Sequence, residues 1–556
     1  MKFFTTIAVV LATCGIARGQ WQNTTYNLRG GWNAIHLSGD ASYDEIGNLF
    51  PADVLEVWRW NPNPTQVQFT ESPLIPSAGV PEWQVWKRGF PADSSLNQLT
   101  GQASYLVKCS GSSSDSYTVV LKQSPLPPKN TWVRNGANLM GFPTSSASGN
   151  FPLFSNYFAS FPIATAANTK IFKYVGGELG PANPLQVFSP SAERLDRSKA
   201  YWFSAEAVGN FYGPLEINLD SPDGIRFGRT GSLVTAHVRN RSGAPITVTF
   251  TPTAGEAAPV GEPEITGLVP ITLRSFNTST LMWQETPISD AVSEVIAPQT
   301  TKTITFGIDR GDSAMSSSSV GSYFASLLRV TDSGNLIDIA LPVSATKGSL
   351  SGLWVGDIAL NQAGFGSGGG ETSREFGLRT LIHVPDSGSP KLLSEVYLGP
   401  HKDSPHASCV TTDESQLDVS SLGNSQRLTA AHMPLNQVIT TGSGSFAIGA
   451  SLERTIQVPF NDPTNPFVHQ YHPDHDNKSP RGQALPAGVE SYDITRTCTF
   501  EFTSQPPSGS TVTSGWGSSV VGGVYRETIT GLHRNPITLS GTFELRRVSE
   551  IGVLTQ

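Results

Sequence analysis

The sequence predicts an all-β protein made of serial β-sandwich-like domains, with few or no long helices. Three observations predict this: apolar and polar residues alternate in short runs, glycine or proline ends these runs, and charged residues make up only 15% of the chain. The 556 residues include 54 glycines and 40 prolines, above the usual share of each. This composition excludes a coiled coil, a helical bundle and a charge-driven disordered protein.

The length predicts several domains, because a folded domain has about 100–200 residues. We expect a signal peptide at residues 1–19 and two β modules at 20–124 and 125–221. An immunoglobulin-like domain at 222–347 and a C-terminal β domain at 348–556 with a histidine-rich loop follow. The net charge of −8 gives no basic footprint for nucleic acid, so nucleic acid is not an expected partner.

The N-terminus has the pattern of a secretory signal peptide. Lys2 precedes an apolar stretch at residues 3–12, and the small residues Ala17 and Gly19 precede the expected cleavage before Gln20. The apolar stretch is shorter than the about 20 residues that span a bilayer. We therefore expect a secreted or cell-surface protein with no transmembrane segment after cleavage.

Three cysteines remain after this cleavage: Cys109, Cys409 and Cys498. An odd number in an exported chain allows at most one intramolecular disulfide. Cys409 and Cys498 both lie in the last third of the chain, so they are the expected pair. Three buried, unpaired thiols are the alternative.

The first two domains have the pattern of a tandem repeat. Three features recur in the same order in both domains: an opening strand, an aromatic-basic-aromatic strand, and a leucine six residues before a tyrosine. The matching segments are 31–37 with 136–142, 57–60 with 171–174, and Leu99 and Tyr105 with Leu195 and Tyr201. Their spacing varies, as expected where surface loops absorb changes in length.

The opening Gly31-Trp32-Asn33 and the closing Ala200-Tyr201-Trp202 resemble a tandem β module of exported bacterial surface proteins. The resemblance covers residues 25–221, although the second copy has Ala137 in place of the tryptophan. It implies a bacterial, exported protein with two such modules, and it implies no catalytic residues.

The third domain begins with a predicted hairpin. Val234, Ala236 and Val238 alternate with polar residues, a Gly-Ala-Pro turn follows at residues 243–245, and alternation resumes over residues 246–250. Several such strands over this length resemble an immunoglobulin-like domain. The antibody-type Cys–Trp–Cys core is absent, so the resemblance implies architecture alone.

The fourth domain has clear strand patterns at both of its ends. Residues 353–360 begin it, and residues 524–528 and 542–545 close it. These segments are similar to the C-terminal region of uncharacterised exported proteins of Planctomycetes and Verrucomicrobia. The similarity implies a bacterial source and no particular activity.

A histidine-rich stretch in this domain offers a candidate metal site. Pro473 lies within it and disfavours a helix, so we expect a loop. Imidazole and carboxylate ligands suit zinc, and the carboxylates of the histidine-rich stretch alone suit calcium. The alternative is a polar loop that hydrogen-bonds its own backbone. The candidate ligands are His469, His472, Asp474, His475 and Asp476.

A second set of candidate ligands comprises His401, His406 and Cys409. A zinc site normally needs four ligands, so this set would need help from the histidine-rich loop. The alternative is a solvated loop. Sequence spacing does not show whether the two segments meet.

Trp58 and Trp60 form a candidate ligand-binding pair. In a strand they share one face, and they could stack on a sugar if exposed or fill the core if buried. Phe172 and Tyr174 occupy the matching positions of the second copy, which favours the core.

The chain contains no Gly-x-Ser-x-Gly elbow and no glycine-rich phosphate loop between a strand and a helix. The sequence therefore predicts an exported, non-catalytic surface or extracellular protein with a binding or structural role. Its expected partner is an extracellular or envelope polymer or a protein. The alternatives are a metal-dependent hydrolase, with its site in the fourth domain, and a carbohydrate-binding protein.

Overall fold

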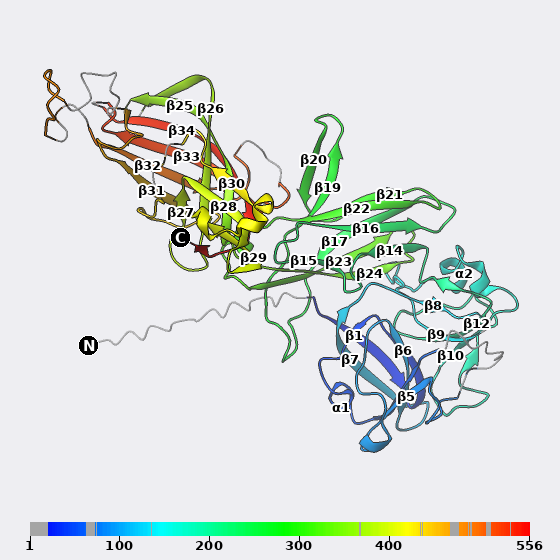
Figure 1. Ribbon diagram of the computed structural model, residues 1–556. Coiled ribbons are helices and arrows are strands. Elements are labelled where there is room, and N and C mark those ends of the chain that lie inside the picture. The colour runs from blue at the N-terminus through cyan, green and yellow to red at the C-terminus, as the bar shows by residue number, and fades with distance from the viewer. Residues whose placement is uncertain are drawn as a thin grey trace, which may run out of the picture.

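The computed structural model describes residues 20–62, 73, 75–134, 136–365, 368–433, 435, 438–466, 478–486, 489, 492–507, 513–533 and 535–555. Strands dominate this part of the chain, and the prediction of an all-β protein without long helices is confirmed (Figure 1). No helix in the described ranges is long and apolar enough to cross a membrane. The α-helices have four residues each: α1 (Ile46–Leu49), α2 (Phe154–Tyr157) and α3 (Ser313–Ser316). The 3-10 helices are η1 (Pro91–Asp93), η2 (Pro162–Thr165), η3 (Glu414–Gln416) and η4 (Val419–Asn424).

The first part of the chain folds into two sheets. One is three-stranded in the order β1-β7-β3, and the other is four-stranded in the order β2-β6-β4-β5. Alternating apolar residues such as Tyr26, Leu28 and Val57 meet in a core between them. The strands are β1 (Gln22–Arg29), β2 (Gly31–Leu37), β3 (Gly39–Asp40), β4 (Val54–Trp60), β5 (Trp83–Lys87), β6 (Ala103–Cys109) and β7 (Ser116–Pro125).

The second part has a four-stranded sheet whose order follows the same plan. Its order is β11-β10-β12-β9, so the strands that carry the matching sequence segments occupy matching positions in the two sheets. A two-stranded sheet of β8 and β13 accompanies it. The strands are β8 (Thr131–Trp132), β9 (Gly136–Met140), β10 (Lys170–Lys173), β11 (Leu185–Gln186), β12 (Tyr201–Ala205) and β13 (Gly209–Asn210).

A buried asparagine makes the same set of contacts in both sheets. The Nδ2 of Asn33 donates to backbone oxygens of Arg29, Gly31 and Val107, and its Oδ1 accepts from the Arg29 N–H at 2.8 Å. Asn138 in β9 repeats this pattern. Its amide binds Val133 twice and also reaches the oxygens of Gly136 and Phe203. Each amide thus ties three backbone segments together, which fixes how the first strand enters its sheet.

The two four-stranded sheets pack against each other through a tryptophan-rich core. Trp60 of β4 donates its Nε1–H to the oxygen of Ala137 in β9 at 2.8 Å. The ring centroids of Trp60 and Trp202 are 5.9 Å apart. Backbone hydrogen bonds join Trp32 to Gly177 and Ala200 to Ala34. The buried members from both sides are Trp32, Ala34, Trp58, Trp60, Trp83, Val85, Leu106, Ala137, Tyr174, Ala200 and Trp202.

The third part is a β-sandwich of two sheets. One has the order β14-β16-β22-β19-β20, and the other has the order β15-β24-β23-β17-β21 with β18 against β23. Phe250 and Phe306 meet between the sheets with ring centroids 5.4 Å apart. The strands are β14 (Leu215–Leu219), β15 (Ile225–Gly228), β16 (Leu233–Asn240), β17 (Ile246–Thr253), β18 (Ile265–Gly267), β19 (Ile271–Asn277), β20 (Met282–Pro287), β21 (Val292–Ile296), β22 (Thr301–Ile308), β23 (Tyr323–Asp332) and β24 (Asp338–Thr346).

The sandwich begins before the expected boundary at residue 222, because β14 pairs with β16 in its first sheet. Its core is continuous with that of the second module, since Phe142 and Phe158 belong to the same buried cluster as Phe250 and Phe306. The sandwich therefore rests directly on the second module.

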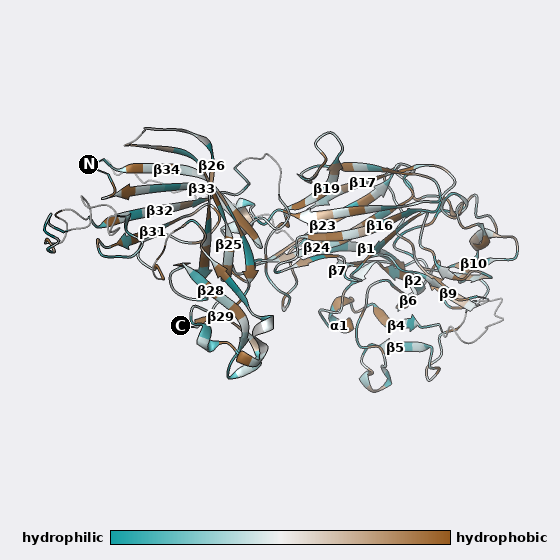
Figure 2. Ribbon diagram, turned by 45° about the horizontal axis from the view of Figure 1, so that its top comes forward, coloured by the Kyte–Doolittle hydropathy of each residue, from teal (hydrophilic) through white to brown (hydrophobic). Residues whose placement is uncertain are grey.

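The last part is built on a seven-stranded sheet in the order β27-β26-β25-β34-β33-β32-β31. A smaller sheet, β30-β28-β29-β35, covers part of one face. Apolar and polar residues alternate along β31 to β34, as the colours of Figure 2 show. This part lies beyond the sandwich from the two modules (Figure 1). The strands are β25 (Gly352–Phe365), β26 (Gly368–Val384), β27 (Lys391–Leu393), β28 (Glu395–His401), β29 (Ser404–Thr411), β30 (Gln426–Thr429), β31 (Ser451–Val458), β32 (Ile494–Phe502), β33 (Val520–Thr530), β34 (Ile537–Ser549) and β35 (Leu554–Thr555).

The expected disulfide between Cys409 and Cys498 is wrong, because both thiols are free and buried. Cys409 lies on β29 beside Tyr397 and Leu417, whereas Cys498 lies on β32 in the core of the seven-stranded sheet. The two residues therefore belong to different sheets and different apolar clusters. Burial raises the pKa of both thiols, that of Cys498 to about 12.

The free thiols predict that reductant does not change the stability of the protein. Adding dithiothreitol should leave the midpoint of chemical denaturation unchanged, and thiol titration of the unfolded mature chain should find three reactive groups. A clear loss of stability on reduction would contradict the free-thiol assignment.

A buried histidine lies where the first module meets the second. His36 of β2 contacts the Oγ of Ser104 through Nδ1 at 3.1 Å, and its backbone N–H donates to Ser198. Burial, with a smaller contribution from the positive charge of Arg197, lowers the pKa of His36 from 6.5 to about 4. The imidazole is therefore neutral in the folded protein at neutral pH.

This lowered pKa predicts a stability that falls in mild acid. Between pH 6.5 and about pH 4 the unfolded chain binds a proton at His36 that the folded chain does not. Lowering the pH from 6.5 to about 5 should remove about 2 kcal/mol of unfolding free energy through this group. Comparison of wild type with His36→Gln over this window measures the difference. Parallel pH dependences of the two proteins would refute the assignment.

Candidate binding groove

The first candidate metal site lies outside the described residues. His469, His472, Asp474, His475 and Asp476 all fall in residues 467–477. The proposal that these side chains bind zinc or calcium therefore stays a prediction from the sequence.

The second set of candidate ligands does not come together. The segment expected to be a loop forms a hairpin of β28 and β29, with His401 opposite Ser404 at its tip. His406 is exposed, while Cys409 points into an apolar cluster from the other face of the strand. Within the described ranges, no three His, Cys, Asp or Glu side chains are grouped so that they could hold a metal ion.

Trp58 and Trp60 do not form an exposed stacking surface. They are 5% and 7% exposed, and both belong to the tryptophan-rich core between the two modules. Trp58 donates its Nε1–H to Glu56 at 2.8 Å, and its ring meets Trp83 edge to face. A sugar cannot reach rings buried in this way, so the assignment of this pair as ligand-binding is corrected to a structural role.

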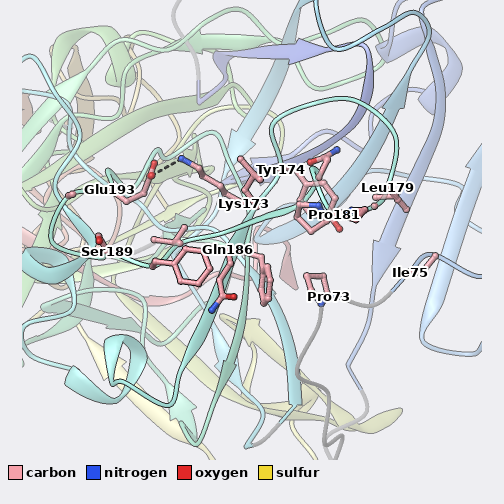
Figure 3. A pocket seen from close by; sticks show the side chains of 17 residues that line it. Pro73, Ile75, Lys173, Tyr174, Leu179, Pro181, Gln186, Ser189 and Glu193 are labelled. Atoms are coloured by element: carbon pink, nitrogen blue, oxygen red, sulfur yellow. Dashed lines mark hydrogen bonds and ion pairs between the residues drawn. The ribbon is translucent and has the colours of Figure 1, made fainter.

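An open groove of about 830 Å³ lies on the second module, beside the tryptophan-rich core. It runs along β10 and β11 and is bordered by the loops at residues 179–184 and 187–193 (Figure 3). Pro73 and Ile75 of the first module complete one side. Chain segments from both modules therefore contribute to its walls.

Aromatic and proline residues make up six of the seventeen residues that line the groove. Phe172 extends from β10, Tyr174 directly follows that strand, and Phe188 is 81% exposed beside β11. Proline rings add flat, rigid CH surfaces that lose little entropy when a ligand binds. The prolines of the lining are Pro73, Pro181 and Pro184.

Polar side chains surround this apolar lining, and the two charged ones among them form an ion pair with each other. Lys173 and Glu193 form an ion pair at 2.6 Å across one end of the groove (Figure 3). The amide of Gln186 lines the same surface. Burial raises the pKa of Tyr174 to about 12, so its phenol stays neutral, and its oxygen accepts the Nε1–H of Trp202. The groove thus offers hydrogen-bonding groups without net charge.

The loop that forms one wall is anchored to both modules. Asn183 is buried, and its Nδ2 donates to the oxygens of Trp32 and Gly177, each at 3.0 Å. Its Oδ1 accepts the N–H of Val175 at 3.0 Å. Gly177 adopts a φ of +84°, a region that glycine reaches without strain. These contacts fix the wall before any ligand arrives, which lowers the entropy lost on binding.

Sequence reasoning did not single out this groove. Phe172 and Tyr174 only match Trp58 and Trp60 in the repeat pattern, and Phe188 lies outside that pattern. The available signal was the dense run of glycine, proline and one aromatic residue over residues 176–190, which is typical of a structured surface loop.

The arrangement is suited to binding through ring faces. Exposed aromatic and proline rings can stack on flat CH surfaces, while the Gln186 amide and the Lys173–Glu193 pair can exchange hydrogen bonds with hydroxyl groups. The sequence matches no protein-family model and no curated protein.

Proposed function

We propose that this chain is an exported, non-catalytic binding and structural protein that contacts a polysaccharide of the cell envelope or extracellular matrix. The observation that carries the proposal is the open groove without net charge, lined by Phe172, Phe188 and three proline rings. Ile75, Leu185 and Phe188 are all exposed on its lining, and a group of exposed apolar side chains at a groove is typical of a binding site.

The shape of the groove favours a polymer over a small molecule. Phe188 stands in solvent, so a ligand on it is covered from one side only. A long chain can lie along such a surface and gain contacts at several units, whereas a small ligand needs enclosure on most sides.

Its chemistry favours a glycan over a peptide. An extended peptide would add to a sheet edge through backbone hydrogen bonds. The edge strand here, β11, has only two residues, too few to hold a peptide strand. Sugar rings instead present CH faces to aromatic side chains and hydroxyls to groups such as Gln186 and the Lys173–Glu193 pair.

The proposed structural role rests on the modules. Two copies of one module at residues 20–221 would account for the shared strand order and for the matching contacts of Asn33 and Asn138. Their tryptophan-rich core and the direct contact with the sandwich would hold the groove on a rigid support. Export is proposed from the signal-peptide pattern alone.

Binding to insoluble polysaccharides tests this function. The purified mature protein should sediment with at least one of cellulose, chitin or peptidoglycan. Phe188→Ala should weaken that binding by about tenfold, because an aromatic stacking contact is worth about 1 kcal/mol or more. Phe90→Ala is the matched control, since Phe90 is also a mostly exposed phenylalanine, at 63%, and does not line the groove.

Two results would contradict the proposal. One is the absence of sedimentation of the wild type with all three polymers. The other is equal binding by Phe188→Ala and wild type, which would place the contact elsewhere on the molecule.

A further inference from the structure

A second opening, of about 540 Å³, lies at one end of the seven-stranded sheet. It is bordered by the ends of β25, β31 and β33 and the starts of β26, β32 and β34. These strands lie far from the groove of the second module (Figure 1). The opening therefore belongs to a separate site.

The described lining of this opening is mostly aliphatic. These side chains continue the face of the sheet that is filled, further along, by a core containing Trp354, Phe500 and Phe543. The opening is thus the part of this apolar face that described side chains leave open. Its apolar lining is Leu360, Ala363, Phe376, Leu378, Val458, Pro466, Ile494, Ile529, Leu532 and Leu539.

The inner end of the opening carries a buried ion pair. Arg496 of β32 donates through Nε to Glu527 of β33 at 2.5 Å, and the side chain of Glu527 is fully buried. Tyr525 donates its O–H to the other carboxylate oxygen at 2.8 Å. The two charges cancel, so this end of the opening attracts neither a cation nor an anion strongly.

One charged lining residue, Arg374, lies at the outer end of the opening without a described ion-pair partner. Arg374 of β26 is exposed, and no described acidic group lies within ion-pair distance of it. Among the described lining residues, the charged ones are Arg374, Arg496 and Glu527, so the opening has a net charge of one positive group at its rim. This places a cation beside the solvent and an apolar surface below it.

We propose that this opening binds a long-chain carboxylate, with the alkyl chain along the aliphatic lining and the carboxylate at Arg374. The volume lies within the range of small-molecule sites, and burial of an alkyl chain gains free energy with every methylene removed from water. The guanidinium fork matches a carboxylate in geometry and charge. This binding is independent of the polysaccharide groove, so either proposal can fail alone.

Fluorescence titration with dansyl-labelled undecanoate tests the proposal, with its methyl ester as the uncharged probe. The wild type should bind both, and the carboxylate more tightly. Arg374→Gln should weaken the carboxylate about fivefold to tenfold and leave the ester unchanged. The matched control is Arg379→Gln, because Arg379 lies on the opposite face of the same strand and pairs with Asp357.

A second pair of variants tests the position of the alkyl chain. Ala363→Trp fills the opening from an exposed position and should weaken both probes by more than tenfold. Val548→Trp places the same ring on the outward face of β34 and should change neither titration. Failure of the wild type to bind either probe would overturn the proposal. Unchanged binding by Ala363→Trp would also overturn it, because the probe would then bind elsewhere.

Discussion

Replacing Trp202 with alanine is expected to lower the free energy of unfolding of the two modules by about 3–5 kcal/mol. Trp202 is buried in the core between the two sheets. Its ring centroid lies 5.9 Å from that of Trp60 and 6.3 Å from that of Trp83, and its Nε1–H donates to Tyr174. The substitution therefore leaves a large cavity and an unpaired phenol at the contact between the modules.

Chemical denaturation followed by tryptophan fluorescence measures this loss. Trp283→Ala is the control, because that indole is 59% exposed and packs at the surface against Arg274 and the exposed ring of Phe276. It should cost less than about 1 kcal/mol. Similar losses in the two variants would mean that the interface between the modules contributes little to stability.

Replacing Glu527 with glutamine is expected to destabilise the seven-stranded sheet by about 3–5 kcal/mol. The change leaves the guanidinium of Arg496 buried without the carboxylate that it contacts at 2.5 Å. The control is Glu501→Gln on the neighbouring strand. Its pair with Arg526, at 3.1 Å, is exposed and should be worth less than about 1 kcal/mol.

A double variant distinguishes the destabilisation caused by a lone buried charge from the net contribution of the ion pair to the free energy of unfolding. Arg496→Met with Glu527→Leu removes both charges and keeps similar volumes, so it should be much less destabilising than Glu527→Gln alone. Equilibrium denaturation of all four proteins gives the comparison. A double variant as unstable as the single one would show that the pair itself stabilises the sheet.

The fold class was predictable because strand alternation is a local property. Val234, Ala236 and Val238 alternate in the sequence and face the sandwich core from β16 as expected, with Val234 only partly buried. The matching strands of the two modules were also visible, since Trp58 and Phe172 keep the same place in similar patterns. Such signals need no knowledge of the rest of the chain.

The packing between domains was not predictable, because it depends on which faces meet in space. Alternation shows that Trp58 and Trp60 share a face, but it does not show that a second sheet covers that face. Cys409 and Cys498 lie close enough in sequence to suggest a pair, yet the fold places them in different sheets. Proximity along the chain is a weak guide to contact when strands can join any sheet.

The candidate groove could not be derived for a related reason. Phe188 and Pro184 are ordinary loop residues in the sequence, and their importance comes from the wall that Asn183 fixes beside them. The candidate carboxylate site depends likewise on six strand ends that converge only in the folded sheet. Surface openings are properties of the assembled chain.

Hydrogen–deuterium exchange with and without the bound polysaccharide tests the proposed function most directly. Polysaccharide binding in the groove predicts slower exchange over residues 170–193, which form its floor and wall, and little change over the seven-stranded sheet. Protection confined to another region, with residues 170–193 unchanged, would contradict it.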